Sequence, residues 1–188
     1  SPRRPAPTYS PTIAGYIPGS NVKPHSMIDL DMAELETFAG AYATSTTWRT
    51  DALFVYENGG NGKCTTANEN GVGCAVGGAK GNSLKSSSVR TIKGFATAGD
   101  AKMLNWDMFP KYKAYWNDAN YADTFITKDY SAISKDSGTN ELIKKGANYH
   151  AVWMYVLHEL EDAVADCTNG DITANDNSVH AWDEGWAF

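Results

Sequence analysis

The longest helical pattern of the chain lies at residues 139–167, which read TNELIKKGANYHAVWMYVLHELEDAVADC. This stretch contains no proline, begins at Thr139 or Asn140, either of which can cap a helix, and stops before Asn169-Gly170. The alternation of apolar and polar residues that marks β-strands is nearly absent from the whole sequence. We therefore predict a mostly α-helical fold, an irregular bundle around this one long helix.

Shorter helices are expected before the long one. An apolar stripe that begins at Ile28 and ends at Tyr42, with spacings of three and four, predicts a first helix starting near Asp29 or Asp31. Further helical segments are expected at residues 50–57, 88–96, 102–117 (interrupted at Pro110) and 118–135. One of them carries the aromatic residues Trp106, Phe109, Tyr112, Tyr115 and Trp116, a density that is typical of a protein core rather than of a ligand-stacking surface.

The N-terminus has a different character from the rest of the chain. Six of the seven prolines lie in the first 24 residues, so residues 1–24 are expected to form an extended arm or linker. Pro2, Pro7 and Pro11 each follow Ser or Ala, a context in which proline hydroxylation and glycosylation are possible. Residues 25–188 form the helical domain, which we expect to be truncated at its C-terminus because its last helical pattern has no cap.

The chain has three cysteines. Cys64 and Cys74 bracket a loop rich in glycine and asparagine, and in a secreted protein they would close it as a disulfide. Cys167 is then left over, which predicts a partner outside this chain.

Charge excludes some functions and favours others. The 188 residues carry a net charge of -6, which argues against nucleic-acid binding, and no apolar run approaches the roughly 20 residues of a membrane span. The last 43 residues hold eight acids and no Lys or Arg, so they carry -8 and the first 145 carry +2. The C-terminal quarter is therefore suited to meet cations.

The long helix places ionisable groups among its apolar residues. On an ideal wheel, His150 and Glu161 share the apolar stripe, and His158 lies at its edge. A buried carboxylate without a partner is costly, and no basic residue is nearby in the sequence. Either a basic residue arrives from elsewhere in the fold or a metal ion supplies the positive charge.

A repeated pattern favours the metal ion. His158 and His180 each open a His-x-x-acid-acid sequence, which on a helix places the imidazole beside its carboxylates. We expect His158, Glu161, His180 and Glu184 as ligands, supported or replaced by Asp162, Asp183 and His150. This donor mix suits iron, and also zinc or manganese. Because such ligands must lose their protons, affinity is expected to fall between about pH 7 and 5. His25 is expected to have no role.

Hydrolytic enzymes are not favoured. His158-Glu159 opens the zinc-protease motif His-Glu-x-x-His, but position 162 is Asp, and the nucleophile motif Gly-x-Ser-x-Gly is absent. We therefore do not expect the chain to be an enzyme; the alternatives that the residues leave open are a ferroxidase-like oxidation and a metallohydrolase activity.

Four stretches resemble a known family. Residues 28–36 (IDLDMAELE), 89–95 (VRTIKGF), 149–167 (YHAVWMYVLHELEDAVADC) and 179–188 (VHAWDEGWAF) are similar to the algal low-iron-inducible, high-CO2-inducible periplasmic proteins. The resemblance implies a secreted protein of the periplasm or extracellular space that binds iron for assimilation. The alternative, suggested by the proline-rich arm, is a structural subunit of a glycosylated extracellular fibre or cell-wall layer, with self-association or matrix components as partners.

Overall fold

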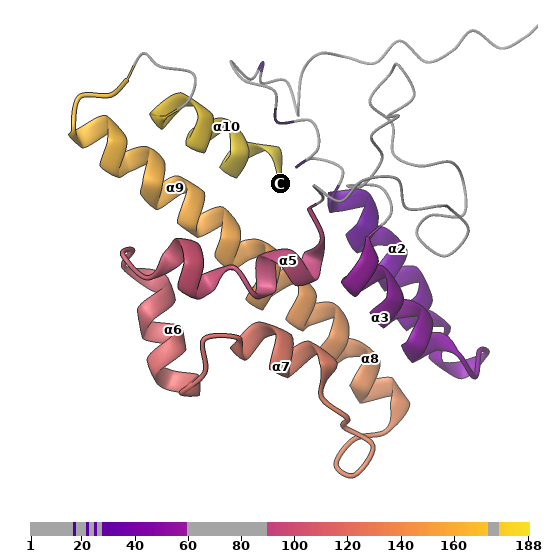
Figure 1. The fold of residues 1–188 in the computed structure, drawn as a ribbon. Coiled ribbons are helices and arrows are strands. Elements are labelled where there is room, and N and C mark those ends of the chain that lie inside the picture. Colours follow the sequence, from indigo (N-terminus) through magenta and orange to yellow (C-terminus); the bar gives the residue numbers. More distant parts are fainter. Residues whose placement is uncertain (1–16, 18–21, 23–24, 26–27, 60–89, 173–176) are drawn as a thin grey trace, which may run out of the picture.

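The computed structural model describes residues 17, 22, 25, 28–59, 90–172 and 177–188 (Figure 1). Regular structure in these ranges is helical, without a strand, which confirms the predicted fold class. In chain order the elements are α2 (Ile28–Gly40), the 3-10 turn η1 (Ala41–Ala43), α3 (Trp48–Asn58), α5 (Ile92–Ala96), η2 (Gly99–Met103), α6 (Met108–Trp116), α7 (Tyr121–Thr127), α8 (Asp136–Lys145), η3 (Gly146–Val152), α9 (Trp153–Thr168) and α10 (Ser178–Ala187). The proposed disulfide partners Cys64 and Cys74, and the proposed modification sites Pro2, Pro7 and Pro11, lie outside the described residues.

The long helix is built from three consecutive segments. α8, η3 and α9 follow one another without a break and form the axis of the molecule (Figure 1). The middle segment, η3, is π-helical, with hydrogen bonds that reach one residue further than in an α-helix. The prediction of one long helix is therefore right in extent, but its turns are not uniform.

Proline and asparagine set the limits of α6. The expected helix at residues 102–117 is in fact the π-helical turn η2 followed by a new helix, and Pro110 is the third residue of that helix rather than an interruption. A proline is tolerated in the first turn because its missing N–H would have no intrahelical partner there. The helix ends at Asn117, whose φ of 50° is left-handed. The segment expected to be helical up to residue 135 ends earlier, with α7.

The other helices pack around this axis. α2 and α3 pack against each other, and α2 also contacts α8. α5 and α7 cover η3, and α10 runs back along α9 (Figure 1). The first helix buries Ile28, Met32 and Leu35 as its spacing predicts, whereas Phe38 and Tyr42 of the expected stripe are half-buried and pack against the core. The core that these helices share brings α9 and α10 together at one end of the molecule.

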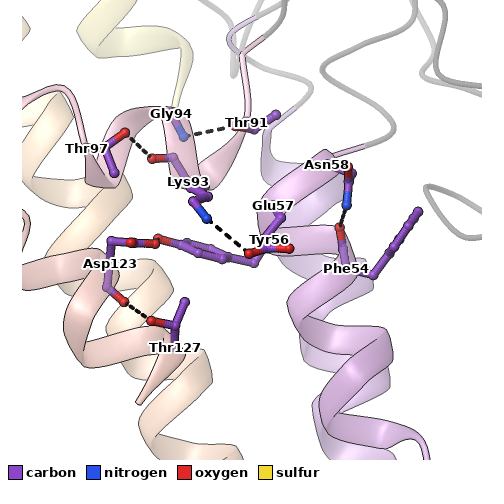
Figure 2. A network of polar contacts seen from close by, with 10 residues as sticks. All are labelled: Phe54, Tyr56, Glu57, Asn58, Thr91, Lys93, Gly94, Thr97, Asp123 and Thr127. Atoms are coloured by element: carbon purple, nitrogen blue, oxygen red, sulfur yellow. Dashed lines mark hydrogen bonds and ion pairs between the residues drawn. The ribbon is translucent and has the colours of Figure 1, made fainter.

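A polar network joins α3, α5 and α7 next to this core (Figure 2). The hydroxyl of the fully buried Tyr56 donates to Asp123 Oδ1 at 2.8 Å, and Lys93 Nζ lies 3.0 Å from Glu57 Oε1. The backbone carbonyl of Asp123 also accepts from the Thr127 hydroxyl at 2.7 Å. These contacts hold α5 and the residues before it in place against α3.

Among the helices in the described ranges, none combines the length and the apolarity that crossing a membrane requires.

Candidate metal centre

The buried face of α9 carries polar groups. Tyr155, His158 and Glu159 are buried on it, and Asp162 is half-buried on the next turn. α10 packs along this face and adds the buried Glu184. The two helices therefore enclose a cluster of imidazoles and carboxyl groups, as the repeated histidine pattern predicts.

The buried face of α9 is rotated about the helix axis from the apolar stripe that the ideal helical wheel predicts. Val164, placed on the apolar stripe by the wheel, is 64% exposed. Glu161 reaches the start of α6 instead, where its carboxylate accepts hydrogen bonds from the backbone of Asp107 and Met108. The reason is η3: each residue that a π-helical turn adds rotates everything after it by about 100°. Glu159 thereby enters the cluster, and Glu161, an expected ligand, is not among the three donors that converge there.

Three side chains of α9 have the geometry of a ligand set. One donor atom each from His158, Glu159 and Asp162 can be chosen so that all three lie within 4.8 Å of one another. His158 Nε2 and Glu159 Oε1 are 3.8 Å apart. His158 Nδ1 is buried and has no hydrogen-bond partner among the described residues. Burial, with help from the Lys102 charge, lowers the pKa of His158 to about 4, so its imidazole is neutral and able to bind a metal at neutral pH.

Glu159 and Glu184 form a hydrogen-bonded carboxyl pair between α9 and α10. Burial and the neighbouring Glu184 raise the pKa of Glu159 to about 8. Gly185 allows this close approach, because a Cβ there would lie 3.0 Å from Leu160 Cδ2 and 3.5 Å from Glu159 Cβ. At neutral pH the pair shares a proton that a metal ion can replace.

Two more imidazoles meet at Glu184. His180 Nε2 lies 3.0 Å and His25 Nε2 lies 3.1 Å from Glu184 Oε1. His25 is only 1% exposed, accepts a hydrogen bond from Arg90 Nε, and packs edge-to-face on Phe188 with 5.3 Å between ring centroids. Burial, followed by the charge of Arg90, lowers the pKa of His25 to about 3. His25, which the sequence did not place at the site, is therefore a buried neighbour of the carboxyl pair.

Two cations reach the cluster from outside the C-terminal quarter. Arg90 lies 3.6 Å from Glu184 Oε1, and Lys102 donates to the Tyr155 hydroxyl at 2.6 Å. The Lys102 charge also opposes the rise in the pKa of Glu159. The sequence left two sources of positive charge open for a buried carboxylate: a basic residue from elsewhere in the fold or a metal ion. Arg90 and Lys102 show that basic residues from elsewhere supply part of this charge. Among the described residues, the carboxyl groups of Glu159, Asp162 and Glu184 thus face the two cations Arg90 and Lys102. The cluster is left with one negative charge or one proton in excess.

Two further expected ligands, His150 and Asp183, are buried or half-buried on other parts of the helices. His150 belongs to an aromatic cluster, with its ring centroid 4.9 Å from Phe125 and 5.6 Å from Tyr121. Asp183 is fully buried on α10, next in sequence to Glu184. Cys167 is exposed and forms no disulfide with the described part of the chain.

Sequence reasoning missed Glu159, His25, Arg90 and Lys102. The only signal for Glu159 was its place beside His158 in the incomplete protease motif. Arg90 lies 94 positions before Glu184, and no local spacing connects them.

Comparison with known proteins adds no identification. No protein-family model matches the sequence, and neither curated proteins nor solved structures gave a match.

Proposed function

We propose that this chain binds a transition-metal ion through His158, Glu159 and Asp162, and that the ion is iron taken up outside an algal cell. The observation that carries the proposal is the convergence of one imidazole and two carboxyl groups within 4.8 Å on one face of α9. The resemblance of four stretches to iron-assimilation proteins of algae supports iron as the cargo. Binding and release are the whole function proposed, without a catalytic step.

The three donors fit a metal ion after a small adjustment. Ligands at about 2.1 Å from an ion lie at most about 4.2 Å apart, so the separations between the three donor atoms need to contract by no more than about 0.6 Å. One nitrogen and two oxygens form a borderline-to-hard donor set, which suits iron, manganese or zinc and disfavours copper(I).

The residues around the three donors suit reversible binding. Glu159 is held by Glu184 and Tyr155, and Glu184 in turn contacts His180 Nε2 at 3.0 Å. Such outer contacts orient ligands and raise metal affinity. The proton of the carboxyl pair leaves when the ion binds and returns when it is released, which provides a route to unloading at low pH.

Metal analysis and calorimetry test the proposal. Purified protein is analysed for bound metal, stripped with a chelator and titrated with Fe(II) without oxygen, and then with Zn(II) and Mn(II). We expect iron to bind the parent, and His158→Ala and Asp162→Asn to lose affinity by at least about tenfold, as expected when a ligand is removed. Glu161→Gln is the matched control, because it changes a carboxylate of the same helix that caps α6.

Two results would refute the site. One is full iron affinity in both ligand variants, and the other is loss of affinity in Glu161→Gln alone. Absence of any binding by the parent would instead refute the function, and the extracellular fibre alternative would then take its place.

A further inference from the structure

A pocket of about 300 Å³ lies between α6, α7 and the loop after α7, and none of its lining residues belongs to the metal centre. Four aromatic side chains form most of its wall: Trp116, Tyr121, Phe125 and Tyr130. Its volume is at the lower end of the roughly 300–1,000 Å³ that small-molecule sites span. The ligand it can take is therefore small.

The rings are arranged as a platform with an open rim. Trp116 and Tyr121 are parallel within 5°, with centroids 6.2 Å apart, and Phe125 meets Trp116 edge-to-face at 6.0 Å. Tyr121 is 2% exposed whereas Trp116 is 40% exposed. The expectation that the aromatic residues of this segment form core is thus wrong for Tyr115, which is 82% exposed, and for Trp116, which offers an apolar surface to solvent at the mouth of a pocket.

Hydrogen bonds fix the walls. The Tyr130 hydroxyl donates to the Phe125 carbonyl at 2.8 Å, and the Thr124 hydroxyl donates to Asp118 Oδ2 at 2.6 Å. Arg49 donates to the backbone carbonyl of Lys128 at 3.1 Å, which anchors the start of the loop. A site whose walls are held in advance loses little conformational freedom when a ligand binds.

The π-helical segment η3 supports the pocket from behind. A Cβ at Gly146 would lie 2.8 Å from Phe125 Cδ1, so only glycine allows this close contact. η3 also places His150 edge-on to Trp116 and Tyr121, with centroids 5.9 and 5.6 Å away. π-helical turns are rare and occur frequently at functional sites.

The polar groups at the pocket decide the class of ligand. Asp118 supplies a carboxylate and Lys128 an ammonium group, which lies 5.5 Å from the centroid of the Tyr130 ring. A cationic ligand would meet Lys128, and an anionic ligand would meet Asp118. A neutral molecule with several hydroxyl groups can donate a hydrogen bond to the Asp118 carboxylate and accept one from the Lys128 ammonium group. The C–H bonds of a sugar ring also pack well on the electron-rich face of an indole. We propose that this pocket binds a neutral sugar ring, with Trp116 as the stacking surface and Asp118, Thr124 and Lys128 as hydroxyl partners.

Ligand-observed NMR on the full chain tests the proposal. Four neutral glycosides serve as probes: methyl β-glucoside, methyl α-mannoside, methyl β-galactoside and methyl α-arabinofuranoside. At least one is expected to show saturation transfer to its ring C–H protons, with a dissociation constant on the order of 1 mM for a ligand of this size. Trp116→Ala should weaken binding by at least about tenfold, since it removes the stacking surface. Trp182→Ala is the matched control, because Trp182 is 45% exposed on α10.

A second variant separates binding from folding. Lys128→Ala removes an exposed side chain and leaves the backbone carbonyl that Arg49 holds, so it should weaken sugar binding while the circular dichroism spectrum is unchanged. The proposal is wrong if none of the glycosides binds below about 50 mM, far above the expected range. It is also wrong if both variants bind as the parent does, or if tetramethylammonium binds in place of the sugars, which would indicate a site for cations.

Discussion

Replacing Glu159 by Gln should make the metal-free protein more stable and remove its metal binding. The carboxyl of Glu159 is 4% exposed and hydrogen-bonded to Glu184. An amide in its place keeps the shape and donates an N–H to the Glu184 carboxylate. What the substitution removes is a group whose charged form is disfavoured in the fold.

The size of the effect follows from the pKa of Glu159, which burial and Glu184 raise from 4.5 to about 8. Between these values the folded chain holds a proton that the unfolded chain releases, so this group reduces stability as pH rises and its effect is complete above pH 8. At pH 7 the unfolded chain gains from ionisation over about 2.5 pH units, worth about 1.4 kcal/mol each, or about 3 kcal/mol in total. Glu159→Gln should recover most of this at pH 7 and little at pH 4.5.

Urea unfolding in the presence of a chelator measures the difference. With an m-value of about 2–3 kcal/mol/M, a gain of about 3 kcal/mol moves the midpoint upward by about 1 M at pH 7. Comparing variant and parent at each pH cancels the other titrating groups, including His25 and His158. Glu141→Gln is the control of opposite sign, because a hydrogen bond from Lys144 lowers the pKa of Glu141 and its removal brings no gain.

A Glu159→Gln variant that is less stable than the parent at pH 7 to 8 would refute the reasoning. It would mean that Glu159 is a stabilising carboxylate paired with Lys102 or Arg90 rather than a strained ligand. A gain that is equal at pH 4.5 and 8 would point to packing instead of titration.

Three further predictions concern the same fold. Metal affinity should rise with pH until about pH 8, with one proton released per ion, because the proton on Glu159 competes with the metal. Titration calorimetry in buffers of different ionisation enthalpy counts this proton. A change in metal affinity that is confined to pH 5–7 would instead indicate that the competing protons are on the imidazoles. His25→Ala should lower the free energy of unfolding by about 1–3 kcal/mol, since it leaves a cavity and removes buried polar contacts, and an unchanged urea midpoint would show that this residue lies outside the fold. Gly99→Ala should destabilise by about 1–3 kcal/mol, because its Cβ would lie 2.0 Å from Phe109 Cζ; adding Phe109→Leu should return part of the loss, and additive effects would contradict the contact.

Sequence alone determined the fold class. Helical periodicity, capping residues and the lack of strand alternation are local properties, so the long axis and the stripe of α2 could be predicted from them. The packing of α10 against α9 agrees with their short connection, because consecutive elements usually lie adjacent in space. Two of the expected ligands, His158 and Glu184, lie buried where α9 and α10 pack together, and their binding of a metal stays a prediction.

Only the tertiary structure decided which side chains meet. The π-helical turn η3 rotates α9, so that Glu159 faces α10 and Glu161 faces α6. α5 and α7 pack against that turn, and no rule of local spacing contains this information. Arg90 and Lys102 reach the carboxyl pair from distant parts of the chain for the same reason. Periodicity describes one helix at a time, whereas the electrostatics of a buried cluster depends on every helix packed against it.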